Sequence, residues 1–214
     1  MVAGSATVGR RALAKEQRRQ QLIDATIKCI AKKGLSSTTL ADVAKEAGLS
    51  QGIVNLHFDS KDNLLYETLR YVSEDYDKQF MATYAQTSAD PAACLLALIK
   101  MDLQPSICDA KKLAVWFAFW SEVKAVPTYQ KLCAARERKY DDVLVDLAAR
   151  IIDDGGYEDA DASLVAKALG SLTDGLWLSC LVDPKSFDRQ VALNTVKSYL
   201  RGIFPDHYLR EPTA

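Results

Sequence analysis

Thr38–Phe58 reads TTLADVAKEAGLSQGIVNLHF, and this short stretch is the most informative in the chain. Val43 and Ala47 fall on one side of a first helix, and the neighbouring Ala44 is small enough to let another helix cross closely. Gly48 follows the expected helix end, where glycine readily takes a left-handed conformation. The stretch therefore predicts two short helices joined by a tight turn.

The residues that bound these two helices favour the same interpretation. Thr39 and Asp42 have the spacing of a capping box for the first helix, and Ser50 is a good N-cap for the second. Leu49 and Val54 are apolar and are expected to close a small core between the helices. This helix-turn-helix arrangement is typical of DNA-binding proteins, in which the second helix enters the major groove.

Charge is divided unevenly along the chain. The 214 residues carry 27 Lys and Arg against 28 Asp and Glu. From Arg10 to Lys61, however, ten basic residues face five acidic ones, which leaves the rest of the chain acidic. A basic N-terminal part favours a polyanion as its partner, although a charge run is more often only the solvated face of a helix.

The most basic segment, Arg10–Gln20, reads RRALAKEQRRQ. Two interpretations are open. The segment is either a flexible arm that adds contacts to phosphates or to the minor groove, or merely the solvated start of the first helix.

Helical periodicity recurs along the whole chain, and strand patterns are nearly absent. The stretches that show it are about 16–33, 61–85, 91–101, 111–124, 127–152, 162–181 and 187–204. Proline, glycine and aspartate separate them, as expected at helix ends. We therefore expect an all-α fold. It would consist of an N-terminal three-helix helix-turn-helix DNA-binding domain, residues 10–60, and a C-terminal helical bundle for ligand binding and dimerisation, residues 61–210.

Composition argues against several classes of protein. Only two histidines occur, His57 in the opening stretch and His207 near the C-terminus, so neither a Ser-His-Asp triad nor a histidine-rich metal site is expected. No glycine-rich phosphate loop is present in the sequence. We therefore expect no enzymatic activity, no catalytic residues, no bound metal and no cofactor.

Cysteine usage and hydropathy bound the environment of the protein. The five cysteines are far apart, form no Cys-x-x-Cys pair and are expected to be buried free thiols. The N-terminus lacks the charged and apolar regions of a signal peptide, and no apolar run approaches the roughly 18 residues of a membrane span. We therefore expect a cytoplasmic protein without a membrane partner.

Aromatic residues gather at two places in the acidic part of the chain. Within AVWFAFWSEV, Trp116, Phe119 and Trp120 share one helical stripe. Within TDGLWLSC, Asp174 and Trp177 are three residues apart and share one helix face. Such rings either fill the core of a bundle or line a pocket. Aromatic faces beside a carboxylate suit a quaternary ammonium ion, so these five residues are candidate ligand-binding residues.

The helix-turn-helix resembles the DNA-binding region of the TetR family of bacterial repressors. The resemblance rests on TTLADVAKEAGLS, on the glycine that opens the second helix in SQGIVNLHF, and on KDNLL after it. The length of the chain and its helical pattern fit the family as well. Four further segments, WFAFWSEV, TDGLWLSCL, QQLIDATIKCIAKKGL and GIVNLHF, resemble the choline-responsive betaine regulators within this family.

The resemblance implies which residues lie at the DNA: Thr38, Thr39, Ser50, Gln51, Gly52, Asn55, His57 and Lys61. Gln51, Gly52 and Asn55 would face the major groove, whereas Lys61 and one of the two threonines would meet phosphates. Many members of the family have a tyrosine at the position of Asn55. Because asparagine can bind adenine, base readout is expected to differ in this chain.

The resemblance also implies partners. It favours a homodimeric repressor, bound to a double-stranded, palindromic DNA operator and released by a small-molecule effector. The last two helices would form a four-helix bundle with a second copy, or would simply complete the core of one chain. A quaternary ammonium compound and a neutral lipophile are both open as effectors. An all-helical enzyme or small-molecule carrier is the alternative from another class.

Overall fold

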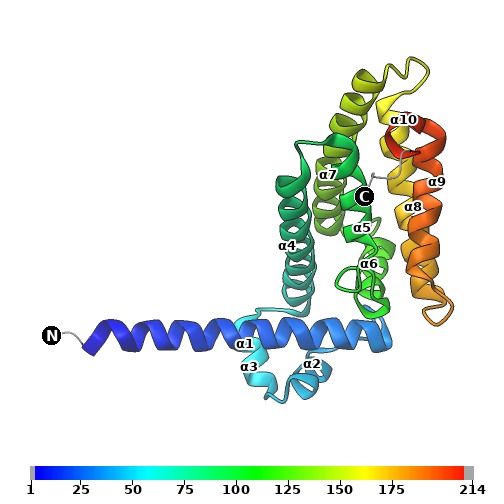
Figure 1. Ribbon diagram of the computed structural model, residues 1–214. Coiled ribbons are helices and arrows are strands. Elements are labelled where there is room, and N and C mark those ends of the chain that lie inside the picture. Colours follow the sequence, from blue (N-terminus) through cyan, green and yellow to red (C-terminus); the bar gives the residue numbers. More distant parts are fainter. Residues whose placement is uncertain (1–2, 210–214) are drawn as a thin grey trace. The chain divides into compact units, whose positions relative to one another are not determined.

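The computed structural model describes residues 3–209, with side chains from Ala12 onward. In this part the chain forms helices joined by short loops (Figure 1). They are α1 (Ala3–Lys33), α2 (Leu40–Ala47), α3 (Gln51–His57), α4 (Lys61–Thr87), α5 (Pro91–Asp102), α6 (Ala110–Glu122), α7 (Pro127–Gly155), α8 (Ala162–Val182), α9 (Arg189–Ile203) and α10 (Pro205–Tyr208). No strand occurs among residues 3–209, and the expected all-α fold is confirmed.

The predicted helices agree with the observed ones to within a few residues, with two exceptions. α1 begins at Ala3 rather than near residue 16. The added segment includes the first half of Arg10–Gln20, whose alanine, leucine and arginine residues favour helix. The side chains of Arg10 and Arg11 lie outside the described residues. The second exception is α10, a single turn with Pro205 in its first position, which was not predicted.

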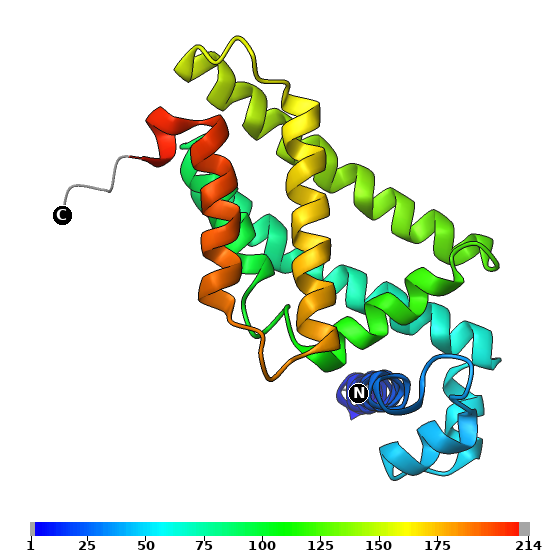
Figure 2. The same cartoon turned by 90° about the vertical axis from the view of Figure 1, so that its right-hand side faces the viewer.

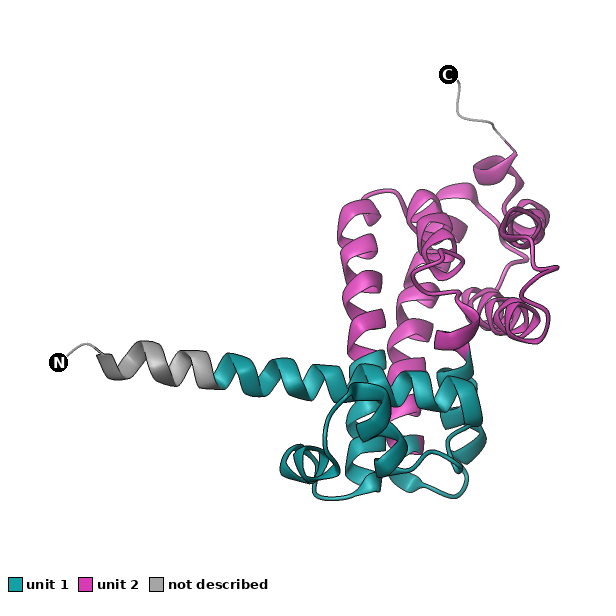
Figure 3. Cartoon of the chain, turned by 90° about the horizontal axis from the view of Figure 1, so that it is seen from below, with its two compact units in different colours: residues 1–72, 114–129 teal, residues 73–113, 130–214 magenta. Residues whose placement is uncertain are grey.

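The chain divides into two compact units (Figure 3). The first comprises the chain up to Val72 together with Ala114–Tyr129. The second comprises Ser73–Leu113 together with the chain from Gln130 onward. α4 is one continuous helix that supplies residues to both units. The division into a DNA-binding region, residues 10–60, and a ligand-binding region, residues 61–210, concerns function and stays a prediction.

Within the second unit, α8 and α9 run antiparallel and contact each other (Figure 2). α8 is the one helix in the described part of the chain that is long and apolar enough to cross a membrane. The prediction that no such stretch exists was therefore wrong for α8. The test uses length and composition only, and helices of soluble proteins also pass it. About 33% of the most apolar window of α8 is buried within the chain.

The five cysteines are all free and buried, as predicted. Burial raises the pKa of the Cys29, Cys94 and Cys133 thiols. Burial and a neighbouring thiol, that of Cys180, raise the pKa of Cys108 to about 12. A thiol reacts as its thiolate, so these four side chains are held in their inert form.

Candidate functional site

The first unit contains the helix-turn-helix that the sequence predicts. Its core joins α1 to α2, α3 and the start of α4, and includes Leu22, Ile23, Ala25, Cys29, Val43, Ala44, Ala47, Val54, Phe58 and Leu64. Val54 is fully buried, and Leu49 packs against the same cluster from its edge. α3 is only seven residues long and buries only Val54, so α3 depends on α1, α2 and α4 for its position.

Local bonds fix the turn between α2 and α3. Thr39 and Asp42 form the predicted capping box, because each side chain accepts a hydrogen bond from the backbone of the other residue. Gly48 ends α2 with φ 65°, and its N–H donates to the carbonyl of Ala44. Ser50 occupies the N-cap position of α3, as predicted, but its hydroxyl makes no capping hydrogen bond. That hydroxyl is exposed at the start of α3.

Ion pairs hold α1 against α2. The Nζ of Lys33 lies 2.7 Å from Oδ1 of Asp42, and the Nζ of Lys32 lies 2.7 Å from Oε2 of Glu46. Hydrogen bonds from Lys33 and from Thr39 lower the pKa of Asp42 to about 2. The capping carboxylate therefore stays ionised at neutral pH.

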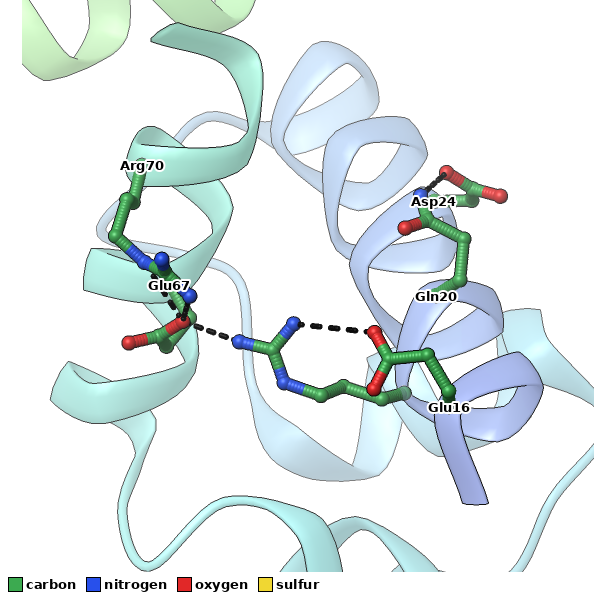
Figure 4. A network of polar contacts seen from close by, with 6 residues as sticks. Glu16, Gln20, Asp24, Glu67 and Arg70 are labelled. Atoms are coloured by element: carbon green, nitrogen blue, oxygen red, sulfur yellow. Dashed lines mark hydrogen bonds and ion pairs between the residues drawn. The ribbon is translucent and has the colours of Figure 1, made fainter. Parts of the chain in front are cut away.

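A second polar network links α1 to α4 (Figure 4). The guanidinium of Arg19 donates to Oε2 of Glu67, which also accepts from Arg70 at 2.6 Å. The same guanidinium lies over the ring of Phe58, 5.6 Å from its centroid. Phe58 ends α3, so Arg19 positions the end of that helix as well as α4.

α3 presents its polar residues to solvent. Ser50, Gln51, Gly52 and Asn55 are all exposed, while Val54 faces the core. Gly52 has an ordinary helical φ, and a Cβ added there would come no closer than 3.8 Å to another heavy atom. The packing of the chain itself therefore does not require glycine at this position.

The other residues expected at DNA differ in exposure. Thr38 is 2% exposed, and its hydroxyl donates to the carbonyl of Gly34 at 2.8 Å. Thr39 is exposed beside the N-terminus of α2. Lys61 is half-buried, and its Nζ donates to the carbonyl of Ser36 at 3.0 Å. Of the two threonines, Thr39 is thus the exposed one, and its hydroxyl donates to Oδ2 of Asp42 at 2.7 Å.

His57 occupies the end of α3, as predicted, but it faces partly inward. Its Nδ1 is buried and has no hydrogen-bond partner among the described residues. Burial, and then the positive charges of Lys15 and Arg18, lower its pKa. His57 is therefore neutral at neutral pH and contributes less positive charge to this face than the sequence suggests.

The second unit contains a cavity of about 60 Å³ lined by α4, α5, α7 and α8. Its polar lining consists of Tyr76, Asp102, Arg136, Glu137, Tyr140, Asp141, Thr173 and Asp174. Phe80, Trp177 and aliphatic side chains complete the walls. Asp174 and Trp177, which the sequence placed on one helix face, lie together on this lining.

Asp102 is the most deeply buried carboxyl group of the cavity. It is 8% exposed, and burial raises its pKa to about 7, although the hydroxyl of Tyr76 donates to it and favours its charged form. Its backbone carbonyl accepts a hydrogen bond from the indole nitrogen of Trp177 at 3.0 Å. Trp177 thereby satisfies a carbonyl at the end of α5.

Asp174 lies nearer to solvent. Its side chain is exposed, but the surrounding protein still desolvates the carboxyl group, and the charge of Glu137 adds to this effect. Together they raise its pKa to about 6. Near neutral pH the cavity therefore holds two carboxyl groups that gain or lose a proton easily.

Arg136 is buried in the same cavity. Its guanidinium lies over two rings, 4.5 Å from the centroid of Tyr76 and 4.7 Å from that of Tyr140. Its Nη1 lies 3.0 Å from Oε1 of Glu137. The hydroxyl of Tyr140 donates to Asp77 at 3.0 Å, which holds that ring in place.

The other three candidate ligand residues belong to the first unit and do not line this cavity. Trp116 and Phe119 are buried, and the ring of Phe119 packs edge-on against Tyr129 at 5.0 Å. Trp120 is half-buried and packs against Phe117. A part for these rings in ligand binding stays a prediction.

Asp102, Arg136 and Tyr140 are candidate site residues that the sequence patterns did not single out. A signal was available, because Asp102 continues the buried stripe of Leu95 and Leu98 on α5. Arg136 likewise interrupts an apolar stripe on α7. A charged residue on an otherwise apolar helix stripe marks a buried charge that needs partners.

The first unit thus has the architecture of a DNA-binding protein, a helix-turn-helix with an exposed polar face on its second helix. Comparison with known proteins agrees with it. Residues 22–68 match the family described as bacterial regulatory proteins, tetR family. Residues 91–205 match the C-terminal region described as that of BetI-type transcriptional repressors.

Individual relatives extend the match to most of the chain. The HTH-type transcriptional regulator BetI of Burkholderia thailandensis is 35% identical over 187 residues, which cover 87% of this chain and 93% of that protein. The chain belongs to the TetR family of transcriptional regulators, with a C-terminal region of BetI type. It is a regulator and not an enzyme.

Solved structures share the fold. A transcriptional regulator from Pseudomonas aeruginosa PAO1 aligns with a TM-score of 0.78 and 27% identity, covering 91% of this chain and 94% of the other. A regulator from Saccharomonospora viridis, solved in complex with choline, aligns with a TM-score of 0.75 and 22% identity, covering 87% and 96%.

Proposed function

We propose that the protein is a homodimeric, cytoplasmic repressor that leaves its DNA operator when a small organic cation binds in the cavity of the second unit. The observation that carries the nature of the effector is the acidic and aromatic lining of that cavity. DNA binding, an effector and a dimer are typical of the family. The operator, the effector and the release mechanism are the parts that we propose.

The exposed face of α3 supports a role in reading DNA. Gln51 and Asn55 carry side-chain amides, which form paired hydrogen bonds with adenine in the major groove. Thr39 lies at the N-terminus of α2, which suits a phosphate, and Lys61, whose Nζ donates to the carbonyl of Ser36, supplies a positive charge. In a dimer, two such helices about 34 to 36 Å apart would fit successive major grooves of a palindrome.

Exposed apolar residues on α8 and α9 support the dimer. Leu164, Leu178 and Val182 on α8 are 70%, 47% and 74% exposed, and Val191 on α9 is 61% exposed. A second copy would cover this surface. Lys167 and Asp174 interrupt the apolar surface of α8, which favours a protein over lipid as the covering partner.

The cavity favours a small cation over a neutral lipophile. Its four carboxyl groups face a single arginine, and the rings of Tyr76, Tyr140 and Trp177 stand beside them on the lining. Trimethylammonium compounds are small, cannot lose their charge and bind aromatic faces. A related fold is known with choline bound, so choline is the first compound to test.

The decisive experiment measures binding of the purified protein to the intergenic DNA beside its own gene. Choline should release specific DNA binding, whereas its neutral isostere 3,3-dimethylbutan-1-ol should not. Release by both compounds at equal concentration would favour a lipophile site instead. Binding that ignores both would contradict the effector, and absence of specific binding would contradict the repressor.

Lys61→Ala should weaken binding to every DNA sequence by a similar factor. A lysine that neutralises one phosphate releases one counterion equivalent, so the slope of log K against log salt should fall by about one unit. Lys100→Ala removes an exposed lysine from the second unit and serves as the control. An unchanged slope in Lys61→Ala would contradict a phosphate contact.

Gly52→Ala should separate stability from DNA binding. Alanine favours helix over glycine by up to about 1 kcal/mol, so the variant should be slightly more stable than the natural protein. The added methyl group should nevertheless lower operator affinity at least tenfold, because it stands between α3 and the DNA backbone.

The matched control is Gly202→Ala on α9, where an added Cβ also has free space. It should gain stability without losing operator affinity. Denaturant titration measures the stability of both variants, and a DNA-binding assay measures their operator affinity. Full operator affinity in Gly52→Ala would show that DNA does not approach this position closely.

A further inference from the structure

The aromatic site in the second unit already holds a cation, and that cation belongs to the chain. The guanidinium of Arg136 lies 4.5 Å and 4.7 Å from the ring centroids of Tyr76 and Tyr140. The two rings meet edge to face, with centroids 5.0 Å apart. A desolvated cation within about 6 Å of a ring face is strongly attracted, and Arg136 is only 8% exposed.

Arg136 also balances the charge of the lining. Among the described residues that line the cavity, it is the one basic side chain, and it faces Asp102, Glu137, Asp141 and Asp174. Arg136 is the positive charge that lowers the pKa of the buried Asp102, whereas Lys167 as well as Arg136 acts on Asp174. An incoming anion would meet these carboxyl groups and an arginine whose charge is already matched.

We propose that Arg136 is a resident cation that a cationic effector must displace from the face of Tyr76 and Tyr140. This inference rests on the proposed function of the cavity as the effector site. On displacement, the guanidinium would follow the exposed carboxylate of Glu137, its neighbour on α7, toward solvent. Arg136 thereby sets the effector concentration to which the regulator responds.

Displacement has two consequences. The ligand competes with the tethered guanidinium of Arg136. The apparent affinity of the protein for the ligand is therefore lowered according to the fraction of time that Arg136 occupies the site. The exchange also breaks a link, because Arg136 stands on α7 and Tyr76 on α4. A free cation can satisfy the rings and carboxyl groups without this link, which leaves α4 and α7 joined through Asp77 by Lys139 and Tyr140. A ligand that binds only one of two arrangements shifts the population toward it.

The test is calorimetric titration of the full-length protein with choline at pH 8, above the raised pKa values of Asp102 and Asp174 in the natural protein. Arg136 lowers both pKa values, so each variant is also titrated at pH 9. Arg136→Met keeps the length and apolar stem of the side chain but removes its charge. It should bind choline at least tenfold more tightly than the natural protein, equivalent to about 1.4 kcal/mol. Arg136→Lys retains a cation and should bind choline within about threefold of the natural protein.

A second measurement distinguishes competition from a general change in the fold. In Arg136→Ala, added methylguanidinium should fill the vacated site and weaken choline binding in a competitive manner. In the natural protein the same compound must also displace Arg136, so it should compete with choline at least tenfold more weakly than in Arg136→Ala. Circular dichroism on each variant verifies that the helices are retained.

The outcomes separate this inference from the proposed function. Displacement is supported if choline binds Arg136→Met but not the natural protein, or if choline binds Arg136→Met more tightly than it binds the natural protein. Equal or weaker binding to Arg136→Met overturns it, and if choline still releases DNA from the natural protein the proposed function stands. Weaker binding would mean that Arg136 contacts the ligand directly. Absence of choline binding to every variant overturns both the inference and the cationic effector.

Discussion

Replacing Phe58 by alanine should abolish operator binding while leaving the cavity of the second unit able to bind its effector. Phe58 is 1% exposed and belongs to the core that joins α1, α2, α3 and α4, with Arg19 over its ring. Truncation of a buried phenylalanine to alanine costs about 3 to 5 kcal/mol. A small domain has only about 5 to 15 kcal/mol of stability in total.

Hydrogen exchange of the amides in α1–α3 should report this loss, and a DNA-binding assay should show it as failure to bind the operator. Leu56→Ala is the matched control for stability, because Leu56 lies on the same helix but is 74% exposed. It should change the stability by less than about 0.5 kcal/mol. Operator affinity retained within threefold in Phe58→Ala would contradict the dependence of α3 on this core.

Asp102→Asn should remove a large part of the pH dependence of stability. Burial raises the pKa of Asp102 from 3.8 to about 7. Between these values the unfolded chain releases the proton and the folded chain keeps it. Stability from this group is therefore present below pH 4, is lost as the pH rises toward 7 and is constant above it.

The size of this effect follows from the pKa difference. At about 1.4 kcal/mol for each pH unit, the variant should gain roughly 4 kcal/mol over the natural protein between pH 4 and pH 8. Asparagine is nearly the same shape and can still accept the hydrogen bond from Tyr76. Arg136 and Asp174 also affect the titration of Asp102, so the measured quantity is the difference between the two proteins at each pH.

Denaturant titration of both proteins across this pH range makes the measurement. Asp183→Asn is the control, because hydrogen bonds from Ser186 lower the pKa of that carboxyl group from its ordinary value instead of raising it. Its difference from the natural protein should stay flat between pH 4 and pH 8. A flat difference for Asp102→Asn as well would mean that Asp102 is ionised throughout this range.

The helix-turn-helix could be predicted from the sequence in detail. The capping box of Thr39 and Asp42, the left-handed Gly48 and the buried Val54 all agree with the structure. The capping box and the turn at Gly48 depend on contacts within a few residues of the chain, and the burial of Val54 follows from the apolar pattern of the helix-turn-helix together with α1 and α4. The family resemblance then added the expected DNA contacts, which local patterns do not contain.

The sites were less accessible to sequence reasoning. Thr38 has the same hydroxyl as Thr39, but one is buried and the other exposed, and only the packing of the chain decides which. The aromatic residues that the sequence offered as ligand-binding candidates lie in different units. Trp177 lines the cavity of the second unit, whereas Trp116 belongs to the first unit. Helical periodicity locates a buried face, but it does not say which other helix covers that face.

The sequence by itself determined the all-α fold, the limits of most helices and the family, because helix signals and turn residues act locally along the chain. Only the tertiary structure decided that Tyr76, Asp102, Arg136 and Tyr140 share one cavity. They come from three helices that lie far apart in the sequence. Desolvation and charge pairing depend on what surrounds a group in space, so the raised pKa of Asp102 and the position of Arg136 emerge only when the helices pack together.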